Sequence, residues 1–328
     1  MVIWRKVVVT LLRRLIPFLI PAVLCTSAAG AGEPLKVHVG IRAEFAVAAQ
    51  GSVWTTDSLE RRLVRIDPAT NSVSARIPLK GSNPLGITYG AGSIWVANRN
   101  GGSVTRVSPK TNKAGKTIRV GFGPYALAYG AGSIWVTNES SGTVSRINPS
   151  RNRVTKTIKI GGGPNGIVAA FGAVWVADYR RGRVLRIDPV RNRVNAKLRL
   201  DHADWITPTA DALWISSETN SVYRLDPQTL QITATVPVGQ NPLASSVLGN
   251  ELWVPNIDSN TVSVVDLASA KASRTIQVGQ APIAVVQAEG DAWVTSEGDG
   301  DVWRLPPTAS RRSAGGTRAT AAAVREAR

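Results

Sequence analysis

Short apolar runs separated by polar turns make up most of the chain, and none of them has the period of an amphipathic helix. Consecutive apolar residues at Ile134, Trp135 and Val136 indicate a strand that is covered on both faces. The two runs that follow alternate between apolar and polar residues, as expected at a half-exposed sheet surface. This stretch therefore predicts four β-strands, Tyr125–Tyr129, Ser133–Asn138, Thr143–Ile147 and Val154–Ile160.

The same pattern recurs along the chain, and a tryptophan marks each copy. Seven tryptophans follow one another at intervals of 39 to 41 residues: Trp54, Trp95, Trp135, Trp175, Trp214, Trp253 and Trp293. Most copies continue with a turn such as Asn148-Pro149, because Pro presets φ for a type I turn. A repeat of about forty residues with four strands predicts an array of like sheets.

Seven four-stranded antiparallel sheets around an axis make an all-β, seven-bladed β-propeller. The small residues of the first strands, such as Ala126 and Gly86, are expected where strands crowd the axis. The seventh copy lacks a fourth strand, and Lys36–Gly40 aligns with the fourth strand of other copies. We therefore expect an N-terminal outer strand to complete the last blade and close the ring.

The chain divides into three parts by composition. Residues 1–31 combine basic residues, a short apolar run and the small residues Ala29-Gly30-Ala31, which predicts a signal peptide, with an uncleaved N-terminal anchor as the alternative. Residues 33–306 hold the propeller, and 307–328 form a basic, flexible C-terminal tail. We expect a protein exported to the periplasm or secreted. Cys25 lies in the first part, so the mature chain would have no thiol chemistry or disulfide.

Charge is distributed unevenly over the propeller. Residues 33–200 carry 26 basic and 8 acidic residues, whereas 201–306 carry 4 and 13. Eleven basic residues fall on or beside three successive outer strands, and we call them the basic rim: Lys113, Lys116, Arg119, Arg151, Arg153, Lys156, Lys159, Arg191, Arg193, Lys197 and Arg199.

The basic rim has two interpretations. It could bind an envelope protein, an anionic polymer or an anionic surface by non-specific electrostatics. It could also protect the outermost strands against edge-to-edge pairing, for which lysine is commonly used. We expect no specific nucleic-acid binding, because aromatic residues for base stacking are not interleaved with the basic ones. We expect a monomer.

The sequence Trp135-Val136-Thr137-Asn138, with the Gly-Thr-Val and Arg-Ile-Asn-Pro elements that follow it, resembles the YVTN family of β-propeller repeat proteins. It is also similar to the streptogramin (virginiamycin B) lyase-like propellers, and the likeness covers about residues 36–306. The lyase resemblance implies a magnesium ion and a His/Glu set that act on a cyclic depsipeptide. Fold alone does not imply function, because one propeller frame carries many activities.

Ligand sites of propellers lie where loops from all blades converge on one end of the channel. At that mouth we expect a polar funnel for a small ligand or a cation. Its candidate residues stand ten before or three after the repeat tryptophan, or in an irregular loop: Asp57, Asn98, Tyr125, Asn138, Asn165, Asp178, Trp205 and Asn256. The alternative is that such strand-end polar residues bond the amides of the next turn.

Catalysis would need a general base at the same end, which histidine supplies most readily. His202 lies in the one fourth-to-first connection that breaks the repeat pattern, and Glu44, Asp204 and Glu218 are its candidate partners. These groups could form a metal-assisted site with Mg²⁺ or Ca²⁺. The other histidine, His38, falls on the outer N-terminal strand. A site with two histidines cannot be built from one, so we expect a non-catalytic binding or scaffold protein, with a streptogramin lyase-like or hydrolase enzyme as the alternative.

Overall fold

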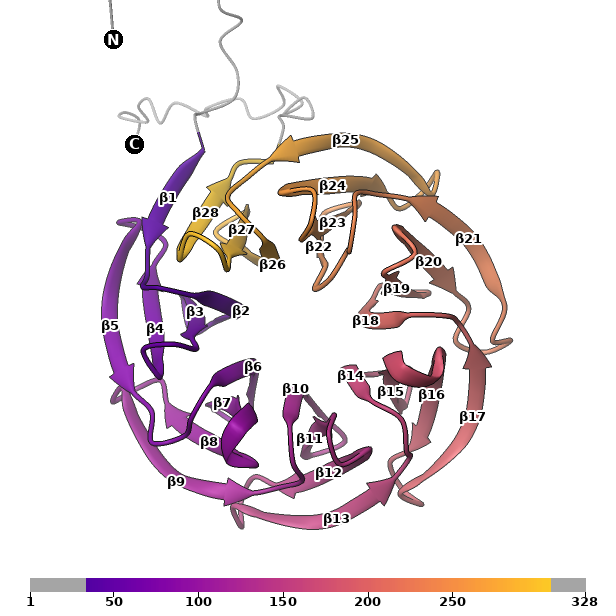
Figure 1. Ribbon diagram of the computed structural model, residues 1–328, viewed down its shortest axis with the longest axis horizontal. Coiled ribbons are helices and arrows are strands. Elements are labelled where there is room, and N and C mark those ends of the chain that lie inside the picture. The colour runs from indigo at the N-terminus through magenta and orange to yellow at the C-terminus, as the bar shows by residue number, and fades with distance from the viewer. Residues whose placement is uncertain (1–33, 308–328) are drawn as a thin grey trace, which may run out of the picture. The chain divides into compact units, whose positions relative to one another are not determined.

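Seven four-stranded antiparallel sheets surround a common axis in the computed structural model (Figure 1), which describes residues 34–307. The expected signal segment 1–31 and residues 308–328 of the expected tail lie outside the described residues. The innermost strand of each sheet lies next to the axis and the fourth forms the circumference. Neighbouring blades pack on both faces of each sheet, so second strands such as Ser133–Asn138 are buried along their whole length. The expected seven-bladed propeller is confirmed.

Each blade from the first to the sixth contains four consecutive strands, and the seventh contains three. Blade 1 has β2 (Ala43–Ala49), β3 (Ser52–Asp57), β4 (Arg62–Asp67) and β5 (Ser72–Pro78); blade 2 has β6 (Pro84–Gly90), β7 (Ser93–Asn98), β8 (Ser103–Ser108) and β9 (Lys113–Arg119). Blade 3 has β10 (Pro124–Gly130), β11 (Ser133–Asn138), β12 (Thr143–Asn148) and β13 (Arg153–Lys159); blade 4 has β14 (Pro164–Ala170), β15 (Ala173–Asp178), β16 (Arg183–Asp188) and β17 (Arg193–Arg199). Blade 5 has β18 (Ala203–Pro208), β19 (Leu213–Ser217), β20 (Ser221–Leu225) and β21 (Ile232–Pro237); blade 6 has β22 (Ser246–Leu248), β23 (Glu251–Asn256), β24 (Thr261–Asp266) and β25 (Lys271–Gln277). Blade 7 has β26 (Pro282–Ala288), β27 (Asp291–Ser296) and β28 (Asp301–Leu305).

The N-terminal strand β1 (Leu35–His38) completes blade 7 by pairing antiparallel with β28, Val37 opposite Val302. The backbone N–H of Val39 continues the pairing by donating to the carbonyl of Gly300 over 3.0 Å. Val37 and Val39 pack into one apolar cluster with residues of blades 1 and 7, so the first and last blades share a core. The closure expected from the alignment of the copies is confirmed.

Each repeat tryptophan packs between its own blade and the next. All seven have 1% exposure or less. Trp135 of blade 3, for example, shares a cluster with Ile167 and Val174 of blade 4, and its Nε1 donates to the Gly130 carbonyl over 3.0 Å. Burial of so large a side chain at every seam supplies much of the apolar area that holds the blades together.

An arginine eleven residues after the tryptophan joins neighbouring blades. The Arg146 guanidinium lies 4.8 Å from the centroid of Trp135, and Nη1 donates to the Pro189 carbonyl (2.7 Å) and to Asn192 Oδ1 (2.9 Å) in the next blade. Arg65, Arg106 and Arg304 repeat this arrangement with the corresponding turns. Asn192 has φ 53°, a left-handed conformation that Asn tolerates better than most residues.

The observed elements differ from the expected ones in detail. Strand bounds in blade 3 shift by one residue, and two single turns of 3₁₀-helix, η1 (Arg99–Gly101) and η2 (Tyr179–Arg181), occur in second-to-third connections. β22 is short, and two residues before it Ala244 forms a parallel bridge to Ala284 of blade 7. No helix within residues 34–307 has the length and apolar content needed to cross a membrane.

Candidate functional site

The polar residues three positions after the repeat tryptophan are fully buried inside their own blades, although we expected five of them at the channel mouth. Asn98 Nδ2 donates to Ser103 Oγ (3.1 Å) and to Thr105 Oγ1 (2.9 Å) of the neighbouring strand. Asn138 and Asn256 make the same two bonds with their own third strands. These three side chains therefore tie a second strand to a third strand.

The two aspartates at this position are also hydrogen-bonded inside the protein, but as acceptors. Asp178 accepts hydrogen bonds from the Gly163 N–H (2.9 Å) and from Arg183 Nε (2.7 Å), and it has no exposed surface. Asp57 accepts from the Ile41 and Glu60 N–H groups, each over 3.2 Å, and is also fully buried. The structure thus places Asp57, Asn98, Asn138, Asp178 and Asn256 in blade-stabilising contacts and not on a ligand-accessible surface.

The residues ten positions before the tryptophan do meet at the axis, and their polar members are Glu44, Tyr125, Asn165 and Asp204. Asn165 Nδ2 donates to Asp204 Oδ1 over 2.8 Å, and Ser58 Oγ donates to Glu44 Oε1 over 2.6 Å. The pKa of Asp204 is raised to about 7, mainly by burial and also by the charges of Glu218 and Glu139, while the Asn165 hydrogen bond lowers it. Burial likewise raises the pKa of Glu44 and holds the pKa of Tyr125 well above its usual value.

Three aromatic rings close the channel just inside the end that holds the His202 loop. We call Phe45, Tyr125 and Trp205 the axial aromatic cluster. The Phe45 and Trp205 rings stack at 5.0 Å between centroids, and Tyr125 meets Phe45 edge-on at 5.7 Å. The three residues come from blades 1, 3 and 5, so their contact must lie near the axis. At this level, side chains therefore occupy the open centre of the ribbon in Figure 1. We call the end with the His202 loop the mouth end and the other the far end.

His202 is exposed and lies beside Glu218 at the mouth end. Its Nδ1 is 4.0 Å from Glu218 Oε2, and its ring is 5.6 Å from the Tyr179 ring. Tyr179 donates its hydroxyl to the same Glu218 oxygen over 2.5 Å, which raises the pKa of Tyr179 to about 12. The structure therefore brings His202 and Glu218 together, with Asp204 close enough to Glu218 for their charges to interact.

Arginines at the mouth end were missed by the sequence reasoning. Glu139 bridges Arg99 of blade 2 and Arg180 of blade 4, and the Arg180 Nη2 to Glu139 Oε1 distance is 2.9 Å. The Arg99 guanidinium also lies 5.3 Å from the centroid of Tyr125. The signal that could have revealed them is position, because Arg99, Glu139 and Arg180 stand at the start of second-to-third connections that converge on one end.

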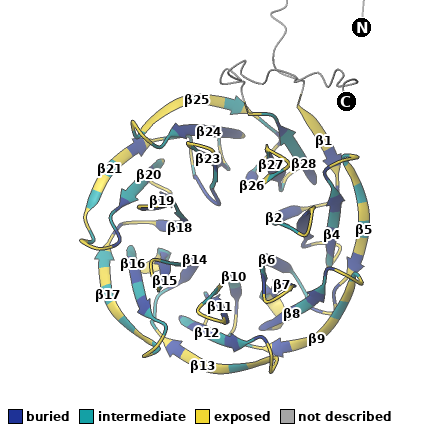
Figure 2. Cartoon of the chain, turned by 180° about the vertical axis from the view of Figure 1, so that it is seen from behind, coloured by how far each residue is buried: buried dark blue, intermediate teal, exposed yellow. Residues whose placement is uncertain are grey.

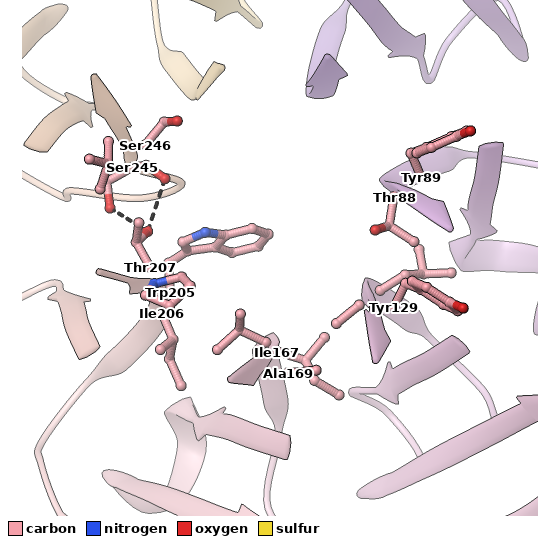
Figure 3. A pocket seen from close by; sticks show the side chains of 15 residues that line it. Thr88, Tyr89, Tyr129, Ile167, Ala169, Trp205, Ile206, Thr207, Ser245 and Ser246 are labelled. Carbon is pink, nitrogen blue, oxygen red and sulfur yellow. Dashed lines mark hydrogen bonds between the residues drawn. The ribbon is translucent and has the colours of Figure 1, made fainter. Parts of the chain in front are cut away.

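A cavity of about 480 Å³ opens at the far end, where the inner strands β6, β10, β14, β18 and β22 run out. We call it the far-end cavity. Among the residues that line it are Thr88, Tyr89, Tyr129, Trp205, Thr207 and Ser246 (Figure 3). Trp205, expected at the mouth, therefore presents its indole to this cavity as well as to Phe45.

The basic rim lies on the circumference of blades 2 to 4, where β9, β13 and β17 follow one another (Figure 2). All eleven of its residues are exposed. Only two of its residues form ion pairs within the described chain, Arg191 with Asp188 (2.9 Å) and Arg199 with Asp201 (3.3 Å). Between blades 2 and 3 the rim borders a groove of about 710 Å³, lined in part by Lys113, Lys116 and Arg106. The second histidine, His38, does not join His202: it lies on the outer strand β1, where its Nδ1 is 2.8 Å from Asp301 Oδ1.

Solved structures of other proteins share the fold of this chain. The virginiamycin B lyase of Staphylococcus aureus superposes with a TM-score of 0.74 at 15% identity, over 84% of this chain and 99% of that chain. A streptogramin B lyase gives 0.74 at 15% identity over 83% and 96%. The fold is that of the streptogramin B lyases. Hydrazine synthase of Kuenenia stuttgartiensis also superposes, with a TM-score of 0.71 at 12% identity over 78% of this chain and 92% of that chain.

This likeness concerns the fold alone. No protein-family model matches the chain, and no curated protein matches it in sequence. Two of the superposed structures are lyases and the third is a hydrazine synthase, so the shared frame does not select a reaction. The function has to be argued from this chain's own side chains.

Proposed function

We propose that the protein is a non-catalytic binding protein that holds an anionic polymer on its basic rim. The observation that carries the proposal is that acidic side chains do not neutralise most of the positive charges of the basic rim. Apart from Arg191 and Arg199, the basic rim forms no ion pair within residues 34–307. Unpaired like charges side by side repel one another, and an anionic partner relieves that repulsion while releasing its own counterions.

Protection of strand edges does not account for the basic rim. β21 is also an outermost strand, and its sequence Ile-Thr-Ala-Thr-Val-Pro carries no charge. The same fold therefore tolerates an uncharged outer edge. The strands β13 and β17, by contrast, carry three charged residues each: Arg153, Lys156 and Lys159, and Arg193, Lys197 and Arg199. An excess confined to three neighbouring blades suits a partner that lies along that arc.

The proposal includes export to the periplasm or beyond the cell, and its support is the signal-like composition of residues 1–31. A partner in that location would be an anionic polymer of the cell envelope. The partner's shared chemistry is a series of carboxylate, phosphate or sulfate groups, since the basic rim offers charge without base-stacking aromatics.

Binding to heparin, a soluble polyanion, tests the proposal. In the rim variant, Lys156, Lys159, Arg193 and Lys197 are all changed to Glu. In the control variant, Arg61, Arg76, Lys80 and Lys271 are changed to Glu, which gives the same change in net charge at exposed positions outside the basic rim. The rim variant should bind at least roughly tenfold more weakly than the control variant, with a shallower dependence on salt. Equal weakening in both variants would show that net charge alone, and not the basic rim, attracts the polymer.

A second candidate function is acid–base chemistry at the mouth end, and the Asp204 carboxyl favours it. A pKa of about 7 lets this group accept and donate a proton near neutral pH. The described residues do not fit the magnesium or calcium ion that the lyase likeness implies, because no three or more His, Cys, Asp or Glu side chains gather there. Glu44, Asp204 and Glu218 instead bond Ser58, Asn165 and Tyr179 separately. We derive no step through a metal.

Turnover of virginiamycin B, the compound after which one superposed lyase is named, tests this second candidate. Disappearance of the compound is followed by chromatography with the unmodified protein, His202→Ala and Asp204→Asn. Loss of turnover in both variants, with no effect of a chelator, is the expected result. Absence of turnover by the unmodified protein would contradict this second candidate.

A further inference from the structure

The far-end cavity contains no charged side chain among the residues that line it, which distinguishes it from the mouth end and from the basic rim. Its volume of about 480 Å³ falls in the range of small-molecule sites. It lies on the opposite side of the axial aromatic cluster from His202, so it is a separate site. The inference that follows is independent of the polymer-binding proposal.

Aromatic side chains supply flat apolar surfaces to the far-end cavity. Tyr129 is 43% exposed there, and Tyr89 lies on the neighbouring inner strand. The indole of Trp205 extends into the space between the side formed by Ser246 and the side formed by Thr88 (Figure 3). Its Nε1 has no hydrogen-bond partner within residues 34–307, in contrast to that of the repeat tryptophan Trp135. The indole N–H is therefore free to donate to a ligand.

Hydroxyl groups surround these aromatic surfaces. Those of Thr88, Tyr129 and Ser246 make no hydrogen bond to another described residue. The Tyr89 hydroxyl accepts from Gln50 Nε2 over 2.7 Å and keeps its own proton for donation. Thr207 and Ser245 already bond each other over 2.8 Å at the edge of the cavity. The cavity thus combines aromatic faces with several neutral donors and acceptors.

We propose that the far-end cavity binds a neutral saccharide. A pyranose ring has an apolar C–H face that packs on Trp or Tyr and hydroxyls around its edge that match Thr, Ser and Tyr hydroxyls. A charged sugar would lose hydration without meeting an opposite charge, which is unfavourable. A purely apolar ligand would leave the Trp205 N–H and the free hydroxyls without partners when it displaced water from them. The neutral, hydroxyl-rich ligand is the class that satisfies both groups of residues.

Titration calorimetry with three neutral disaccharides, maltose, cellobiose and N,N′-diacetylchitobiose, tests the proposal on the unmodified chain. At least one should bind saturably with a stoichiometry of one. Digalacturonate, a charged disaccharide of similar size, should bind at least roughly tenfold more weakly. The rim variant described above should keep the saccharide affinity of the unmodified chain, because the two sites share no residue.

Two aromatic substitutions locate the site. Tyr129→Ala removes a cavity-lining ring that is 43% exposed, and Phe171→Ala removes a ring outside the lining that is 42% exposed. Tyr129→Ala should lower the affinity at least roughly tenfold, and Phe171→Ala should leave it unchanged. Ser246→Asp, which places a charge in the cavity, should also weaken binding. The proposal is overturned if none of the three disaccharides binds, if indole binds and they do not, or if the two aromatic variants behave alike.

Discussion

The rings of Phe45 and Trp205 stack face to face near the propeller axis, 5.0 Å apart and 19° from parallel, although they belong to blades 1 and 5. The two residues occupy equivalent positions, each two before the inner-strand residue that pairs with the repeat tryptophan. The other five blades carry only small residues there: Gly86, Ala126, Gly166, Ala244 and Ala284. At this position, two blades therefore carry a large side chain and five carry a small one.

Removing either ring should open this centre. Phe45 is 3% exposed, so Phe45→Ala should lower the free energy of unfolding by about 3 kcal/mol, through lost burial and the cavity left behind. Trp205→Ala should also destabilise the fold, and the double variant should lose about 1 kcal/mol less than the sum of the single losses because the stacked pair is counted twice. Urea denaturation of the three variants measures this coupling. Strict additivity would mean that the stacking adds nothing beyond separate burial.

The seam between the last and first blades depends in part on one side-chain pair. Arg304 Nη1 donates to Asn71 Oδ1 over 2.7 Å, and Asn71 has φ 52°. Asn71→Gly removes the acceptor while keeping a residue that adopts this conformation readily, so the loss reports the hydrogen bond. We expect a decrease in the free energy of unfolding of about 1 kcal/mol. Asn152→Gly, which removes the equivalent acceptor for Arg106 at an internal seam, is the matched control.

If both variants lose the same amount of stability, the closing seam is equivalent to an internal one. A larger loss in Asn71→Gly would show that the seam between blades 7 and 1 is the weaker one, as expected if only non-covalent contacts hold it. Thermal unfolding followed by circular dichroism provides a second measure of the same comparison. No change in either variant would contradict the role assigned to the arginine.

The fold could be predicted from the sequence because its cause is repeated seven times. The tryptophan spacing sets the blade size, and the missing fourth strand of the last copy led to the prediction that Lys36–Gly40 completes it, which the structure bears out with a strand at Leu35–His38. Each prediction depended on local residues and on a period. An arginine also recurs eleven residues after most repeat tryptophans, but the repeat alone does not show that Arg146 contacts Asn192 of the next blade.

The candidate site could be predicted only in part, because sequence does not show which way a strand-end side chain points. From sequence, Asn98 at the end of β7 could bind a ligand or the next strand. In the structure its side-chain amide donates to the Ser103 and Thr105 hydroxyls of the next strand. The Phe45–Trp205 contact could not be predicted from the sequence for another reason. It joins residues of non-adjacent blades, and only the ring geometry brings them together.

Close approach of a glycine to a buried asparagine gives a further test of the blade interior. A Cβ on Gly81 would lie 2.0 Å from Asn98 Cγ, where no room exists. Gly81→Ala should therefore lower the free energy of unfolding by about 1–3 kcal/mol, because Asn98 must move and its hydrogen bonds to Ser103 and Thr105 are weakened. Gly115→Ala is the control, because its added Cβ would meet only the Arg106 carbonyl oxygen at 3.3 Å. Urea denaturation should show a clear loss for the first variant and a much smaller one for the second.

The Asp204 carboxyl should make the stability of the propeller depend on pH. Its pKa is about 7 in the folded chain and near 4 in the unfolded chain, so between these values the folded state binds the extra proton. The free energy of unfolding therefore falls as pH rises from about 4 to 7 and levels off above, where the buried carboxylate is ionised in both states.

The Asp204→Asn variant isolates this contribution. Burial also raises the pKa of Glu44, which adds a slope of the same sign, so the informative quantity is the difference between the two proteins. The unmodified chain should lose up to about 4 kcal/mol relative to Asp204→Asn between pH 4 and pH 8, since each pKa unit corresponds to about 1.4 kcal/mol. Urea denaturation at several pH values measures both profiles. Parallel profiles would mean that Asp204 does not hold its proton at neutral pH, and the acid–base chemistry considered for the mouth end would lose its supporting observation.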